Sequence, residues 1–308
     1  MRKIPLISLK DKIPSEINSV FIEDIGGIKQ ALKVITKNST NPILLFLNGG
    51  PGAPIINLSH KFIIKLKEKC TIILWDQRGA GITRKLNLKN ISPTLCEMQN
   101  DTNEVIRLLL NVFNKEKIYL SAHSWGTVPG FHIVRVHPEL LHSYFAINPV
   151  INQLESEKHL LEKLKKYFKL KENKTALEEL TSIQIPFTRS KDLFYCRKWL
   201  FAMEGKWYAK TWLFKVFYSK WSDMWFPVWQ KIMKINLTES LREVKCPLYF
   251  LAGQKDMQTS YDLTKEYFDM LIAPTKDFFA FPGVGHLIPN EAPDKMQGIM
   301  LEKINSNT

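Results

Sequence analysis

Three side chains in this sequence, a serine, an aspartate and a histidine, have the types and the chain order needed for nucleophilic catalysis. The serine, Ser124, stands in Leu120-Ser121-Ala122-His123-Ser124-Trp125-Gly126, where an apolar strand runs into a helix. Such a turn pushes a hydroxyl into the open as a nucleophile. A free serine hydroxyl is a poor nucleophile near neutral pH, so the reaction also requires a base, a group that orients the base, and donors for the oxyanion.

The aspartate and the histidine come later, each after an apolar run that predicts a buried strand. Asp256 follows the run at residues 248–252, and His286 closes Phe281-Pro282-Gly283-Val284-Gly285-His286. The order Ser, Asp, His is that of α/β-hydrolases and differs from the orders of chymotrypsin and subtilisin. It predicts that His286 is the general base for Ser124 and that Asp256 holds the imidazole in its useful tautomer.

Each of these roles has a simpler alternative. A loop histidine such as His286 is often satisfied by backbone groups alone. Asp256 can cap the helix that begins near Ser260, alone or together with a catalytic role. The acid can also stand one strand earlier, where this chain has Asn148-Pro149.

Donors for the oxyanion are predicted upstream of the serine. An apolar strand at residues 43–47 leads directly into Asn48-Gly49-Gly50-Pro51-Gly52. Glycine lets backbone come close to a substrate carbonyl, so an N–H of Gly49 or Gly50 can join that of Trp125 at the oxygen. One such donor is worth about 3 kcal/mol of transition-state stabilisation.

Two neighbouring motifs have predicted structural roles. Asp76-Gln77-Arg78 is expected to brace the glycine-rich loop through buried, charged hydrogen bonds. His123 precedes the nucleophile, but we expect the turn to aim it away from the triad, into a packing role.

Elsewhere the sequence alternates short apolar runs with helical segments, after an opening hairpin across Gly26-Gly27. The alternation predicts an α/β fold, the α/β-hydrolase fold, with a mostly parallel central sheet flanked by helices. The predicted strands span residues 20–25, 28–35, 43–47, 71–75, 118–121, 143–147, 248–252 and 277–281. The predicted helices span residues 55–69, 95–113, 125–136, 260–271 and 289–304.

The alternation stops after Asn148. Two charged amphipathic helices, at residues 154–170 and 174–183, lead into a stretch dense in aromatic residues. We interpret residues 149–244 as a helical, aromatic-rich cap inserted into a hydrolase core made of residues 1–148 and 245–308. Rings that the cap does not need for its own core are expected to line an apolar pocket. The cap residues predicted to bind substrate are Glu204, Trp199, Trp207, Trp221 and Trp225.

Four motifs together resemble the proline iminopeptidase branch of the α/β-hydrolases. They are Asn48-Gly49-Gly50-Pro51-Gly52, Trp75-Asp76-Gln77-Arg78-Gly79-Ala80-Gly81, His123-Ser124-Trp125-Gly126 and Gly285-His286. The resemblance covers most of residues 20–150 and 244–305. It implies a serine hydrolase that releases an N-terminal proline or another residue from a peptide.

The chain departs from this branch at four places. Asn48 replaces a histidine, Ala122 replaces the first glycine of the elbow, and Thr83 replaces a serine. In the cap, Met203-Glu204-Gly205 only partly resembles the Trp-Glu pair that helps to hold the substrate's amine in relatives. The fold and the triad are compatible with these changes, whereas aminopeptidase specificity does not follow from them.

Composition excludes several other classes. The chain has 308 residues and 45% hydrophobic content, which suits one α/β domain with an insert. The net charge is +13, but basic residues are interleaved with acids, which argues against nucleic acid. Four separated cysteines indicate neither zinc nor a disulfide framework, and no metal or cofactor is expected. With no run long enough to span a bilayer and no complete signal peptide at the start, we expect a cytoplasmic enzyme.

These residues predict a metal-free serine hydrolase that forms an acyl-enzyme. The aromatic cap favours a carboxylic ester with a bulky apolar group, including a lactone or macrolactone, as the substrate. The second hypothesis is release of an N-terminal residue from a short peptide, with Glu204 either holding the amine or simply solvated. The third is a ligand-binding receptor on a hydrolase scaffold without turnover. The sequence leaves the substrate and the oligomeric state open.

Overall fold

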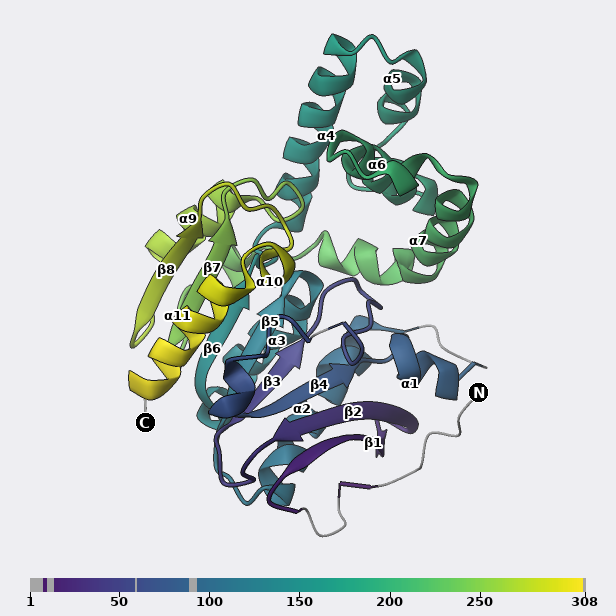
Figure 1. The fold of residues 1–308 in the computed structure, drawn as a ribbon. Coiled ribbons are helices and arrows are strands. Elements are labelled where there is room, and N and C mark those ends of the chain that lie inside the picture. The colour runs from purple at the N-terminus through teal and green to yellow at the C-terminus, as the bar shows by residue number, and fades with distance from the viewer. Residues whose placement is uncertain (1–7, 10–13, 59, 89–92, 307–308) are drawn as a thin grey trace.

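The computed structural model describes residues 8–9, 14–58, 60–88 and 93–306, and its centre is a mostly parallel sheet (Figure 1). The strand order in the described chain is β1-β2-β4-β3-β5-β6-β7-β8. β1 pairs with β2, and β2 with β4, in antiparallel fashion, whereas all pairs from β4 to β8 are parallel. The predicted fold class is confirmed. The strands are β1 (Ile17–Ile25), β2 (Ile28–Thr36), β3 (Ile43–Leu47), β4 (Thr71–Asp76), β5 (Ile118–His123), β6 (Leu141–Ile147), β7 (Leu248–Gly253) and β8 (Lys276–Phe281).

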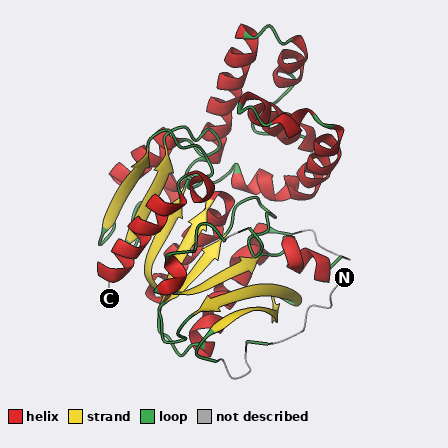
Figure 2. Cartoon of the chain, in the orientation of Figure 1, coloured by secondary structure: helices red, strands yellow, loops and turns green. Residues whose placement is uncertain are grey.

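Helices cover both faces of the sheet (Figure 2). Successive side chains of a strand point to opposite faces, so Leu45 of β3 enters one core and Leu44 the other. The first core is closed by α2 (Leu95–Val112), α3 (Thr127–Val136), α8 (Leu237–Ser240) and α9 (Tyr261–Met270). The second is closed by α1 (Gly81–Leu86), α10 (Ile288–Glu291) and α11 (Pro293–Ser306). Two buried faces explain why the central strand β3 is apolar along its whole length.

The helix predicted at residues 55–69 is wrong. The described residues of this range form turns and a short 3-10 helix, η1 (Leu66–Glu68). The backbone N–H of Ile55 donates to Asp76 Oδ1 at 2.8 Å, and that of Lys65 donates to Gln297 Oε1 of α11 at 2.8 Å. Side-chain acceptors from the sheet and from α11 therefore take backbone groups that a helix would use.

A helical layer lies above the sheet in Figure 1, and in the sequence it is inserted between β6 and β7. Asn152 and Asn173 begin its first two helices, because each side chain accepts a backbone N–H from the first helical turn. Apolar side chains of this layer share one core with Trp125 of the elbow. We call the layer the cap and propose residues 149–244 as its extent. It contains α4 (Gln153–Leu170), α5 (Lys174–Thr181), α6 (Ser190–Met203), η4 (Trp207–Lys210) and α7 (Trp212–Ile232).

Three further features are the absence or presence of membrane-spanning helices, the state of the cysteines and the start of the chain. Within the described ranges no helix combines the length and the apolar composition needed to cross a lipid bilayer. Cys70 and Cys246 are buried, and burial raises the pKa of both thiols to about 12. The prediction that the chain opens without a signal peptide falls mostly on residues 1–7 and 10, which lie outside the described residues.

Candidate active site

The candidate nucleophile stands where β5 meets a short 3-10 helix, η2 (Ser124–Gly126), which continues into α3. Ser124 has a φ of 53°, in the left-handed region that a residue with a side chain adopts only when its surroundings hold it there. Gly126 lets this turn sit on the end of β3, because a Cβ there would overlap the carbonyl oxygen of Leu47. The elbow predicted from the sequence is therefore a close fit between β3 and β5.

The structure brings Ser124, His286 and Asp256 together from three distant parts of the chain. His286 Nε2 lies 2.8 Å from Ser124 Oγ, and His286 Nδ1 lies 2.8 Å from Asp256 Oδ2. Asp256 and His286 are both buried, while Ser124 remains partly accessible. In this arrangement Nδ1–H donates to the carboxylate, and Nε2 can accept the proton of the serine hydroxyl.

Asp256 closes its own turn as well as binding His286. Its Oδ1 accepts the backbone N–H groups of Gln258, at 2.8 Å, and Thr259, at 3.1 Å, and its Oδ2 accepts the Thr259 hydroxyl at 2.7 Å. Burial alone would raise the pKa of this carboxyl, but the charge of His286 and these hydrogen bonds outweigh burial and lower it. Asp256 is therefore ionised near neutral pH. It binds His286 and closes the turn before α9, but the N-cap of that helix is Ser260, so the predicted helix-capping role of Asp256 is wrong.

Asn148 connects the loop that carries Asp256 to the loop that carries His286. It follows β6 directly, and its Oδ1 accepts the N–H of Gly253 at 2.8 Å. Its Nδ2 donates to the carbonyls of Gly285, at 3.1 Å, and of His286, at 2.8 Å. From the sequence alone, Asn148 marks only an alternative position for the catalytic acid. Its place at the end of a parallel strand was the available signal for a role at the site.

His123 does not point away from the triad, so its predicted orientation is wrong. Its Nε2 lies 2.7 Å from the carbonyl oxygen of His286, and the two rings are 5.0 Å apart. Desolvation and the charge of His286 lower the pKa of His123 to about 4. The ring is therefore neutral near neutral pH, with Nε2–H as the donor. β5 extends to His123 before the chain turns, which leaves the imidazole at the sheet edge beside the His286 loop.

A small cavity lies against the candidate nucleophile. Its volume is about 20 Å³, room for about one water molecule. Ser124, Gly50 and Trp125 line it, so the structure brings two of the three predicted oxyanion residues to one place. Gly49 lies behind them, and a Cβ there would come 3.1 Å from the Cβ of Ser124. The other lining residues are Val150, Gln153, Arg197, Trp229, Ile232, Gln258 and Thr259.

Two of the three residues in the predicted brace support this region. Asp76 holds backbone N–H groups just beyond the glycine-rich loop, and Gln77 Oε1 accepts the indole N–H of Trp125 at 3.3 Å. Arg78 turns away instead. Its guanidinium binds Asp101 at 2.9 Å and the carbonyl of the first hairpin turn at 2.8 Å. The predicted brace is therefore wrong for Arg78, which ties the hairpin to α2.

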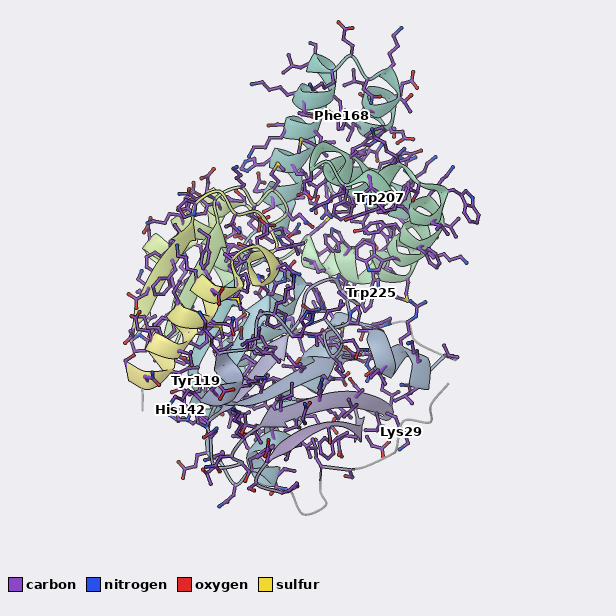
Figure 3. All side chains as sticks on the ribbon, in the orientation of Figure 1. Lys29, Tyr119, His142, Phe168, Trp207 and Trp225 are labelled. Carbon is purple, nitrogen blue, oxygen red and sulfur yellow. The ribbon has the colours of Figure 1, made fainter. Side chains whose placement is uncertain are left out.

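Two cap tryptophans reach the glycine-rich loop. The indole N–H of Trp221 donates to the Pro51 carbonyl at 2.8 Å. Trp225 is fully buried on the side of the cap that faces the sheet (Figure 3), and its ring fills the space beside Gly52 and Gly79, where a Cβ would overlap it. Both rings seat the cap on the loop next to Ser124.

The other two predicted tryptophans lie elsewhere in the cap. The indole N–H of Trp199 donates to Glu179 at 2.8 Å, and its ring packs edge-on against Phe168, so it belongs to the cap's own core. Trp207 is 77% exposed, and its ring contact is with Tyr208. The structure does not bring these two rings to Ser124.

Glu204 ends α6 close enough to the triad for its carboxylate to interact electrostatically with His286 and Asp256. The carboxylate keeps contact with solvent, but desolvation by the surrounding protein is the largest effect on it and raises its pKa. Glu291 is a second negative group nearby, and its carboxylate accepts the N–H of Gly285 at 2.9 Å. Two carboxylates, Glu204 of the cap and Glu291 of α10, therefore lie near the His286 loop, an arrangement that suits a cation.

A parallel sheet with a serine elbow, a glycine-rich loop before it and an Asp–His pair after it defines the α/β class of hydrolases. The chain belongs to the alpha/beta hydrolase fold family, which matches residues 42–293. It is 28% identical over 291 residues to a probable aminopeptidase, YbaC, of Bacillus subtilis strain 168, a match that covers 87% of this chain and 91% of that protein.

Solved structures show the same fold at lower identity. A proline iminopeptidase-related protein from Thermus thermophilus is 22% identical with a TM-score of 0.61, covering 94% of this chain and 98% of that one. An esterase from Thermogutta terrifontis is 16% identical with a TM-score of 0.61, covering 94% and 99%. The predicted resemblance to the proline iminopeptidase branch of the α/β-hydrolases is confirmed.

Proposed function

We propose that the protein is a serine aminopeptidase that releases the N-terminal residue of a short peptide through an acyl-enzyme. The observation that carries the proposal is a carboxylate, Glu204, facing a hydrogen-bonded Ser124–His286–Asp256 line. A peptide's protonated α-amine stands beside its first carbonyl. The anchor for the amine and the nucleophile for the carbonyl must therefore be neighbours, and Glu204 is close enough to the triad to interact electrostatically with His286.

In the proposed reaction Ser124 Oγ attacks the first carbonyl while His286 Nε2 takes the hydroxyl proton. The N–H groups of Trp125 and Gly50 receive the oxyanion in the small cavity. The C–N bond then breaks, and His286 gives its proton to the leaving amine. Water repeats the sequence on the ester, so that the amino acid leaves and Ser124 recovers its proton. Asp256 keeps the imidazole in one tautomer throughout.

One further observation supports this function over the ester hydrolysis that the sequence favoured. The 28% identical relative is itself named a probable aminopeptidase. Hydrolysis of a carboxylic ester or lactone is our second candidate, because the same machinery serves it and because Trp221 and Trp225 place aromatic surface beside the loop.

A matched substrate pair tests the proposal. We expect the enzyme to cleave aminoacyl anilides, including the prolyl one, about 10- to 100-fold better than their N-acetylated forms, because a hydrogen bond between charged groups contributes about that much. A hydrophobic ester and a macrocyclic lactone complete the panel. Preference for the ester or the lactone, without discrimination between the free and the acetylated anilide, would establish the second candidate instead.

The nucleophile is tested separately from the substrate. Ser124→Ala should lose turnover of every substrate by about 10⁴-fold or more, and a fluorophosphonate probe should label the wild-type protein at Ser124 only. An unlabelled, folded wild-type protein that turns over nothing in the panel would instead favour the ligand receptor without catalysis.

A further inference from the structure

The outer side of the cap carries an apolar surface formed by η4 and the first half of α7. Trp207, Trp212, Leu213 and Phe217 are 77%, 72%, 58% and 69% exposed. We call these four residues the outer aromatic face, and Figure 3 labels Trp207 on the cap, away from the sheet. Isolated exposed apolar residues are ordinary, but a cluster of large rings within one short segment marks an interaction site.

The same segment is uniformly basic. From residue 205 to residue 222 the sequence contains Lys206, Lys210, Lys215 and Lys220 and no aspartate or glutamate. None of these four lysines forms an ion pair with a described residue. On the cap helix α4, by contrast, Lys158 pairs with Glu155 at 2.8 Å.

The exposed rings are not needed to hold the cap together. On α7 the rings of Phe214, Tyr218 and Trp221 turn inward and contact one another, with centroids 4.7 Å apart in each successive pair. Trp212 lies on the other side of the helix, as its 100° step per residue requires, whereas Phe217 comes three residues after Phe214 and four before Trp221 and lies at the edge of the inner face. The segment therefore has an inner stack of rings and, beside it and opposite it, large apolar side chains that remain exposed.

A basic groove adjoins this surface. Its volume is about 580 Å³, and its lining includes Lys191, Lys210, Lys215 and Trp212. The lining has four lysines against two acids. Glu179 pairs with Lys198 at 2.7 Å, and Asp223 accepts the Ser190 hydroxyl at 2.6 Å and keeps its negative charge. The groove therefore offers an excess of positive charge to an anionic group beside the outer aromatic face.

We propose that the outer aromatic face docks the protein onto the surface of an anionic lipid membrane, with the rings at the acyl boundary and the lysines at the headgroups. Aromatic rings favour this interface, and lysines are attracted to anionic lipids. A second copy of the chain fits less well, because self-association would place this basic segment against an identical one. The inference is independent of the substrate.

Flotation with lipid vesicles tests the proposal on the full-length protein. The wild type should bind vesicles of phosphatidylcholine mixed with phosphatidylglycerol and should bind pure phosphatidylcholine much more weakly, with binding to the anionic vesicles reduced by salt. Lys210→Gln with Lys215→Gln should weaken partition about 25-fold, since each lysine near an anionic surface is worth about fivefold. Trp212→Ser with Phe217→Ser should weaken it about tenfold or more.

Matched controls on α4 separate docking from a general effect of charge or polarity. Lys163→Gln with Lys166→Gln removes the same charge from exposed positions, and Leu170→Ser removes an apolar side chain that is 77% exposed. Both should bind vesicles like the wild type, and all variants should keep wild-type turnover of a soluble substrate. Failure of the wild type to float with anionic vesicles would overturn the proposal. So would equal loss in the α4 controls, or a dimer that dissociates in the Trp212→Ser, Phe217→Ser variant.

Discussion

At the scale of residues, the candidate base is held at both of its ends. The ring of His286 is bound by Asp256, and its backbone carbonyl accepts two donors, Asn148 Nδ2 at 2.8 Å and His123 Nε2 at 2.7 Å. A carbonyl oxygen has two lone pairs, so both donors can bind it at once. The imidazole therefore keeps its direction toward Ser124 without depending on the Asp256 contact alone.

This arrangement predicts that Asn148 positions His286. Asn148→Asp keeps the shape and the acceptor for the Gly253 N–H but cannot donate to the two carbonyls. We expect both Asn148→Asp and Asn148→Ala to lower kcat about 100-fold with KM nearly unchanged, because a displaced base costs rate rather than binding. Steady-state kinetics on the anilide would measure this. Wild-type kcat in Asn148→Asp would show that only the acceptor matters.

Glu204 predicts a pH dependence that is specific to substrates with a free amine. Its pKa is raised, so it protonates at a higher pH than an ordinary glutamate. As the pH falls through that raised pKa, KM for the anilide should increase, while KM for a neutral ester stays flat. Glu204→Gln should have the high KM at every pH. An unchanged KM in this variant would remove Glu204 from the site.

The same shift has a consequence for stability. A carboxyl whose pKa is raised in the folded state destabilises that state when ionised, so the cost is present near neutral pH and disappears below about pH 4, where the unfolded chain is also protonated. Glu204→Gln should therefore raise the Tm near neutral pH and leave it unchanged in acid. A lower Tm near neutral pH would contradict the shift. Thermal unfolding at the two pH values checks this without any assay of activity.

At the scale of elements, the cap sits on the glycine-rich loop through Trp225. Gly52 has a φ of 81° and no room for a Cβ beside the indole, whereas Gly27 has a φ of 74° and open space around it. Gly27→Ala should cost about 1 kcal/mol of unfolding free energy for the backbone alone. Gly52→Ala should cost about 2 kcal/mol more for the overlap, and it should also lower turnover because the loop beside Ser124 must move. Chemical denaturation and kinetics compare the pair, and equal losses would contradict close packing at Trp225.

A second connection between elements is a buried ion pair in the cap. Arg197 of α6 binds Glu157 of α4 through both guanidinium Nη atoms, and both side chains are almost fully buried. Arg197→Met should destabilise the protein by about 3–5 kcal/mol, because it leaves a buried carboxylate unpaired, and adding Glu157→Gln should recover much of that loss. Lys158→Met, which breaks an exposed pair on the same helix, should cost less than about 1 kcal/mol. Similar losses in the two single variants would contradict this account.

At the scale of the whole molecule, the sheet and the cap contribute different residues to the candidate site. The sheet's strand ends supply the candidate nucleophile, base and acid, and the cap supplies Glu204 and the rings that cover the glycine-rich loop. Two parts of the cap differ in charge. Glu204 is acidic and lies near the triad, whereas the outer aromatic face is exposed and lies among lysines. A change on one is therefore expected to leave the other intact.

Most of the core could be predicted from the sequence, because buried parallel strands are short apolar runs and the elbow has a local signature. β3 matches its predicted range, and the order of Ser124, Asp256 and His286 pointed to the fold. The segment at 55–69 could not be predicted, because Asp76 and Gln297, both distant in sequence, bind its backbone. Local pattern carries no information about such partners.

The sequence by itself thus determined the class of this protein. Its apolar runs predicted buried strands, and its glycines predicted tight turns. The chain order of the candidate nucleophile, acid and base is that of α/β-hydrolases. The tertiary structure alone decided which polar groups meet. His123 and Asn148 join at one carbonyl, Trp199 and Trp207 fall away from Ser124, and Glu204 comes to face His286. These outcomes depend on the packing of elements far apart in the chain, and hydrogen bonds and charges act only over the few ångströms that packing sets.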